Sequence, residues 1–146
     1  MEEKIEKLLM MPYWIIDILP GQVPRDAPGQ YFSIEQYYLT EPRLSEIKGK
    51  HIDTVLKLNC YRALSLDEET SVNPPPEEIA GKMLRQYVSI LFGDSMIISE
   101  PDSTYMTLYH PDEELLALVK TIAAGEGLFV WQPKEQEAQN GAVPGC

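Results

Sequence analysis

Apolar runs alternate with turn signals in the last third of the chain. The runs cover residues 87–92, 96–99 and 105–109, and they are separated by Gly93-Asp94 and by Pro101-Asp102-Ser103. A short apolar run bounded by glycine, proline or aspartate is typical of a buried strand. This part of the chain therefore predicts a three-stranded β-meander.

A helix with marked ends follows the predicted meander. Pro111 stands at its start, the acidic residues 112–114 lie in its first turn, where the helix dipole favours negative charge, and Gly125 ends it. One apolar stripe runs along it: Leu115, Leu118, Val119 and Ile122. A further apolar run, residues 128–131, comes next, so the end of the chain predicts a β-α-β unit.

The first third of the chain contains a second strong strand signal. Residues 13–19 are aromatic and β-branched and lie between Pro12 and Pro20. We expect a central strand here, with Trp14, Ile16 and Ile18 on its buried face. The spacing of apolar residues predicts short helices over residues 2–10 and 76–85.

Two further segments are predicted as strands, and the first of them also fits a helix. In residues 31–40 the apolar positions alternate as in a strand, although some of them also fit one helical face; the aromatic density favours the strand. Residues 52–66 alternate as in a long strand. Between them, Pro42 predicts the start of a short helix that ends near Gly49.

Together these elements predict an α+β fold with a mixed, mainly antiparallel sheet. The sheet consists of the C-terminal β-meander plus the β-α-β unit, and helices pack on one face. A length of 146 residues with 44% hydrophobic residues suits one domain. We expect a single globular domain over residues 1–133 and a flexible polar tail over residues 134–146.

The charge balance limits the possible partners. The chain has 23 acidic and 12 basic residues and a formal net charge of −11. This field repels phosphate backbones and anionic lipids, so we expect neither nucleic acid nor a membrane as partner. The sequence has no signal-peptide pattern and no apolar run near the roughly 18 residues of a membrane span, which predicts a cytoplasmic protein.

Few side chains are candidates for a catalytic or metal-binding role. Asp17 interrupts an apolar strand, which places it either at the exposed or terminal position of that strand or in a cleft, where burial would raise its pKa. His51 shares a predicted strand face with Asp53. The sequence shows no spacing that is typical of metal ligands or of a nucleophile with its base. We expect Cys60 to be a small, buried hydrophobic residue. We predict no catalytic residue, no metal site and no cofactor.

Tyrosine content is the main signal of recognition. The chain has eight tyrosines, and tyrosine provides contact area and a hydroxyl group at low entropy cost. The proline-rich loops at residues 20–30 and 65–78 could carry binding residues too. The candidate binding residues are Tyr31, Glu35, Tyr37, Tyr38, Asp17 and His51.

We therefore predict a non-enzymatic, acidic protein-interaction domain, which could be an adaptor, an inhibitor or an immunity-like domain, with a basic protein as partner. The alternative is a small enzyme or small-molecule binder, whose tyrosine-lined pocket contains Asp17, Glu35 or His51. A flat, acidic, tyrosine-rich patch would favour the first hypothesis, and a pocket with two convergent titratable groups would favour the second. The sequence predicts no oligomeric state.

Overall fold

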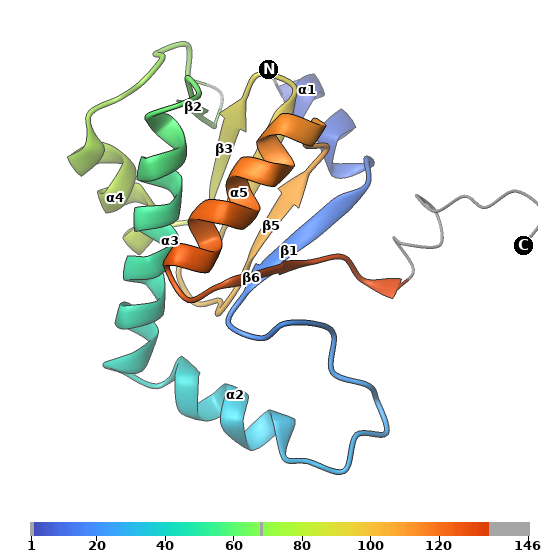
Figure 1. Cartoon of the computed structure of the whole chain (residues 1–146). Helices are drawn as coiled ribbons and strands as arrows, with labels where there is room; N and C mark the ends of the chain where they lie inside the picture. Colours follow the sequence, from blue (N-terminus) through green and yellow to red (C-terminus); the bar gives the residue numbers. More distant parts are fainter. Residues whose placement is uncertain (1, 68, 135–146) are drawn as a thin grey trace, which may run out of the picture.

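The computed structural model describes residues 2–67 and 69–134, and within them the fold is one six-stranded antiparallel sheet with five helices (Figure 1). Residues 135–146 of the predicted tail lie outside the described residues. The strands are β1 (Tyr13–Asp17), β2 (Ser65–Leu66), β3 (Val88–Phe92), β4 (Ser95–Ser99), β5 (Met106–Tyr109) and β6 (Phe129–Trp131). The helices are α1 (Glu2–Leu9), α2 (Tyr31–Leu39), α3 (Arg43–Asn59), α4 (Pro76–Arg85) and α5 (Glu113–Gly125).

The order of the strands is β2-β3-β4-β5-β1-β6. Strands β3, β4 and β5 form the predicted meander, and Gly93 takes a φ of 66° in its first turn. Strand β1 pairs antiparallel with both β5 and β6, so these two strands run parallel to each other with β1 between them. The α+β class, with its meander and β-α-β unit, is thus confirmed.

The two faces of the sheet carry separate apolar clusters. Helices α3, α4 and α5 cover one face (Figure 1), and their side chains bury Ile16, Ile90, Ile97 and Leu108. On the opposite face, α1 places Leu8 against strands β3 and β4. Of the three residues predicted on the buried face, only Ile16 is fully buried; Trp14 and Ile18, which follows β1, pack against the same cluster but are partly exposed.

The strand predictions for residues 31–40 and 52–66 are wrong, because residues 31–39 form α2 and residues 52–59 belong to α3; only residues 65–66 of the second segment form a strand, β2. The helix predicted from Pro42 exists but continues well beyond Gly49. Residues 43–59 form the long helix α3, whose buried positions Ile47, His51, Val55 and Leu58 follow helical spacing. The alternation of apolar residues in the last turns of α3 therefore does not indicate a strand. Residues 31–39 form α2, which lies outside the six-stranded sheet.

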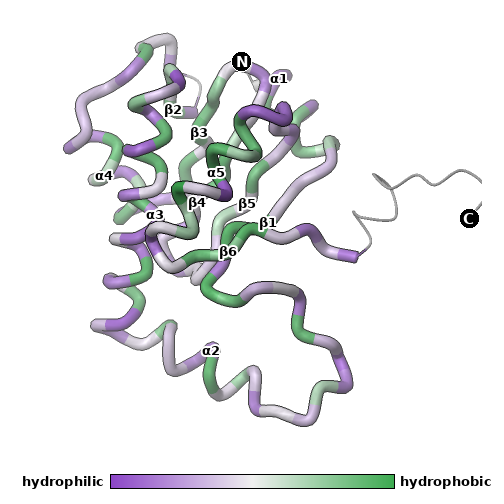
Figure 2. The backbone as a smooth tube through the Cα atoms, in the orientation of Figure 1, coloured by the Kyte–Doolittle hydropathy of each residue, from purple (hydrophilic) through white to green (hydrophobic). Residues whose placement is uncertain are grey.

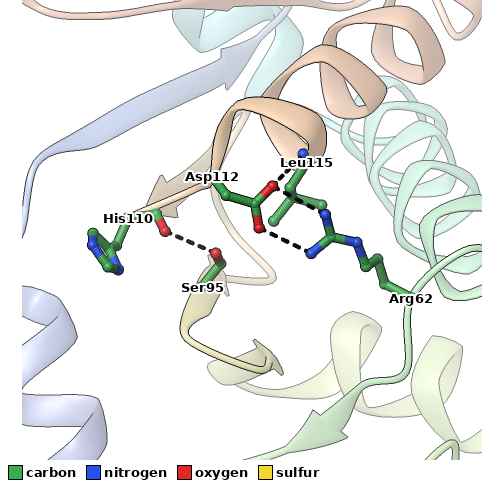
Figure 3. Close-up of polar contacts among 5 residues, drawn as sticks. All are labelled: Arg62, Ser95, His110, Asp112 and Leu115. Atoms are coloured by element: carbon green, nitrogen blue, oxygen red, sulfur yellow. Dashed lines mark hydrogen bonds and ion pairs between the residues drawn. The ribbon is translucent and has the colours of Figure 1, made fainter.

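The start of α5 is held by a cap and an ion pair (Figure 3). The Asp112 carboxylate accepts a hydrogen bond from the Leu115 backbone N–H at 2.8 Å, which makes Asp112 the N-cap. Arg62, which follows α3, donates to both oxygens of that carboxylate at 3.0 and 3.1 Å. These bonds join α5 to the end of α3 and hold the pKa of Asp112 down at about 2, with the arginine as the main cause.

Candidate functional site

Between β1 and α3 the chain forms an arm, defined here as residues 18–39, which contains a long loop and α2 (Figure 1). No residue of the arm is buried, although β1 before it and α3 after it both contribute to the core. Figure 2 shows hydrophobic segments in this loop and helix, away from the region where the other helices cover the sheet. The arm is therefore an ordered element without a core of its own.

Helix α2 presents aromatic side chains to solvent. Phe32 is 81% exposed, Tyr37 53% and Ile34 46%. The rings meet edge to face in two pairs, Tyr31 with Phe32 and Tyr37 with Tyr38, at 5.4 Å between centroids in each pair. An isolated helix of nine residues is marginal in water, and exposed apolar patches commonly mark interaction sites.

A cavity of about 600 Å³ lies between the loop and α2. Its walls come entirely from the arm and are mainly apolar, with Leu19, Val23, Pro24, Ala27, Phe32 and Ile34 among them. Its volume lies in the range of ligand and anchor-residue pockets. We call it the apolar cavity.

A second cavity, of about 40 Å³, lies where α2 meets the end of β1 and the segment before β5. It contains two carboxylates, Asp17 and Glu35, and three tyrosines, Tyr31, Tyr38 and Tyr105. Three residues, Leu19, Tyr31 and Ile34, line this cavity and the apolar cavity as well, so the two adjoin. We call the smaller one the acidic pocket.

Asp17 is the most deeply placed acid of the pocket. It is the last residue of β1 and is only 8% exposed, and its Oδ1 accepts a hydrogen bond from the Ile18 backbone N–H at 2.7 Å. Burial raises the pKa of Asp17 above its usual 3.8, the neighbouring backbone N–H groups oppose this rise, and the charge of Glu35 adds to it. The indole N–H of Trp131 also favours the ionised form but does not reach hydrogen-bond geometry.

Glu35 and Tyr31 are bonded to each other across one turn of α2. The Tyr31 hydroxyl donates to the Glu35 carboxylate at 3.0 Å. Burial and this bond raise the pKa of Tyr31 to about 12, so the hydroxyl remains a donor at neutral pH. None of the ion pairs among the described residues involves Asp17 or Glu35.

Four of the six predicted binding residues, Asp17, Tyr31, Glu35 and Tyr38, thus line one pocket. Tyr37 lies outside it, where the guanidinium of Arg43 stacks on its ring at 3.6 Å from the centroid. Sequence reasoning missed Tyr105, because the residue is distant in sequence and no local pattern places it beside α2.

His51 lines neither of these two cavities, and α3 places it in the interior with no exposed surface. Lys48, 2% exposed, donates to His51 Nδ1 at 3.0 Å, to Ser99 Oγ at 3.2 Å and to the Glu100 carbonyl at 2.8 Å. Burial lowers the pKa of Lys48 to about 8, and burial together with the Lys48 charge lowers the pKa of His51 to about 3. The pair joins α3 to the end of β4.

Two other predictions from the sequence are wrong. Cys60 is exposed, so its prediction as a buried hydrophobe is wrong; it follows the last turn of α3, beyond the packed stripe. Asp53 is exposed while His51 is buried, because two positions along a helix point in different directions. Among residues 2–67 and 69–134, no three His, Cys, Asp or Glu side chains are grouped as a metal site, and no helix could cross a membrane.

Comparison with protein-family models, with curated proteins and with solved structures finds no match to this chain.

Proposed function

We propose that this protein is a non-enzymatic, acidic interaction domain of the cytoplasm, an adaptor, inhibitor or immunity-like domain, and that the arm binds a basic protein. The observation that carries the proposal is the arm itself. It presents Phe32, Ile34 and Tyr37 to solvent and buries none of its residues.

Burial of these side chains by a partner supplies the driving force. Full burial of one large apolar side chain contributes roughly 1.5–3 kcal/mol, and aromatic residues dominate the energetics of interfaces. The net charge of −11 favours a basic partner, because opposite potentials accelerate encounter. The on-rate should therefore fall as salt concentration rises, while the off-rate should change less.

The acidic pocket supports a second candidate function, a small-molecule binder or small enzyme. Asp17 and Glu35 are two titratable groups in one tyrosine-lined pocket, the arrangement that this alternative requires. The first proposal ranks higher because the exposed apolar surface extends along the whole of α2, well beyond a pocket of about 40 Å³.

Site-specific photo-crosslinking in the native host tests the proposal. A benzophenone amino acid replaces Phe32 in one variant and Tyr37 in another, and Tyr61, 70% exposed after the end of α3, serves as the matched control. We expect both arm positions, but not position 61, to crosslink to the same basic protein. The purified pair should then bind with a salt-dependent on-rate, and Phe32→Ser should weaken binding by about tenfold or more.

Three results would contradict the proposal. They are equal crosslinking from position 61, binding that Phe32→Ser leaves unchanged, and crosslinks that join only two copies of this chain. Turnover or tight binding of a small metabolite with unchanged affinity in Phe32→Ser would favour the second candidate function instead.

A further inference from the structure

Among residues 2–67 and 69–134, no ion pair compensates the two carboxylates of the acidic pocket. Asp17 is more than nine-tenths buried, and within this part of the chain the groups that donate hydrogen bonds to it are neutral. Glu35 adds a second carboxylate, bonded to the neutral hydroxyl of Tyr31. A buried charge without an opposite charge costs free energy, which a cation from outside would recover.

The walls of the pocket suit a cation as well. Three tyrosines line it, Tyr31, Tyr38 and Tyr105, and the face of an aromatic ring attracts ammonium and guanidinium groups. The protein already uses this contact on the next ring of α2, because Arg43 stacks on Tyr37 with 3.6 Å between guanidinium carbon and ring centroid. Charge and ring surface therefore point to the same class of ligand.

The size of the pocket limits what can enter it. About 40 Å³ accommodates the head of one side chain and excludes a peptide backbone or a large aromatic group. The apolar cavity adjoins it and offers about 600 Å³ for neighbouring residues. A chain segment with one cationic residue beside apolar residues fits both cavities together.

We propose that the acidic pocket is a socket for one arginine or lysine side chain of the protein partner, with Asp17 and Glu35 as its counter-charges and the tyrosine rings as its walls. The proposal rests on the proposed function, because it assumes that the arm docks a protein. It adds the chemistry of the residue that is recognised and the position that it occupies.

Peptide titrations followed by NMR test the socket without knowledge of the partner. The probes are capped leucine-arginine-leucine and leucine-lysine-leucine peptides, the isosteric peptide with neutral citrulline in place of arginine, and n-butylammonium alone. The reporters are the Ile18 backbone N–H, which bonds to Asp17, and the indole N–H of Trp131. We expect saturable shifts with the cationic peptides and about tenfold weaker binding of the citrulline peptide.

Two charge-neutralising variants locate the binding. Asp17→Asn and Glu35→Gln should each weaken binding of the arginine peptide by about tenfold and leave binding of the citrulline peptide unchanged. Asp53→Asn, which removes an exposed acid from α3, is the control for net charge and should change neither affinity. Because Glu35 lies on the exposed helix α2, its variant folds independently of how Asp17→Asn behaves.

Equal binding of arginine and citrulline peptides, or no saturable shift with any peptide, would overturn the socket. Binding of n-butylammonium as tight as that of the peptides would assign the pocket to a free amine and overturn it too. These failures are distinct from a failure of the proposed function. A partner that tolerates Asp17→Asn and Glu35→Gln but not Phe32→Ser would leave the arm as the interface and remove only the socket.

Discussion

Because His51 is buried in its neutral form, the domain should lose stability in mild acid. The side chain has no exposed surface, and its pKa is lowered to about 3 from 6.5, by burial first and by the charge of Lys48 second. Below pH 6.5 the unfolded chain binds a proton at this imidazole, and the folded chain does not until the pH approaches its own pKa. The stabilisation is therefore complete above pH 6.5 and is lost as the pH falls from 6.5 towards 3.

At pH 5 the size of this loss depends only on the unfolded-state pKa of His51, because pH 5 lies well above the folded-state pKa of about 3. One pKa unit corresponds to about 1.4 kcal/mol, and pH 5 is about 1.5 units below the unfolded-state pKa. His51 should therefore lower the free energy of unfolding by about 2 kcal/mol between about pH 7.5 and about pH 5. This is a large part of the 5–15 kcal/mol that is typical of a domain.

Urea unfolding at both pH values measures this loss in the wild type, in His51→Gln and in His110→Asn. The wild type and His110→Asn should lose about 2 kcal/mol more than His51→Gln, because only His51→Gln removes the buried imidazole. His110 is a suitable control, since it is exposed and its φ of 53° is one that asparagine tolerates. An NMR titration of the wild type in which the His51 ring titrates near pH 6.5 would refute the reasoning, even where the glutamine variant does not fold.

Substitutions at three further positions have defined outcomes. Ile16→Asp, at a fully buried position between β5 and β6, should cost about 4 kcal/mol or more, and a soluble variant with a normal melting curve would contradict this. Asp17→Asn should raise the melting temperature at neutral pH, because burial raises the pKa of this carboxyl and its ionisation disfavours the folded state; calorimetry should show the gain shrinking as the pH falls towards 3.8. Asp112→Ala should cost about 1 kcal/mol in chemical denaturation through loss of the N-cap, and Asp112→Asn, which keeps the cap acceptor, should cost clearly less.

Elements with local signals could be predicted from the sequence. The meander is defined by its turns, and α5 by the acids of its first turn and by Gly125 at its end. Only the first part of helix α3 was predicted, because Val55 to Cys60 alternate in polarity like a strand, whereas the apolar stripe from Ile47 to Leu58 extends over three helical turns. Helix α2 has no buried residue, so its apolar positions form no clear stripe that distinguishes a helix from a strand.

The candidate site could be predicted only in part, for a similar reason. Tyrosine density and an acid within an apolar strand pointed to Tyr31, Tyr38 and Asp17, and these residues do line one pocket. That they bind a partner remains a prediction. Their contact with Tyr105 depends on tertiary structure, and the burial of His51 depends on a helix that the sequence pattern did not predict.

The position of β1 between β5 and β6 constrains when the proposed binding site is first complete during synthesis. The arm follows β1 and leaves the ribosome early, but the acidic pocket also needs Tyr105, and β1 has no neighbours until residues 106–131 have been made. Contacts this distant in sequence form late in folding. A growing chain therefore exposes the aromatic side chains of the arm before it possesses the pocket beside them, and the proposed partner, where it requires both, would bind only chains whose central sheet is complete.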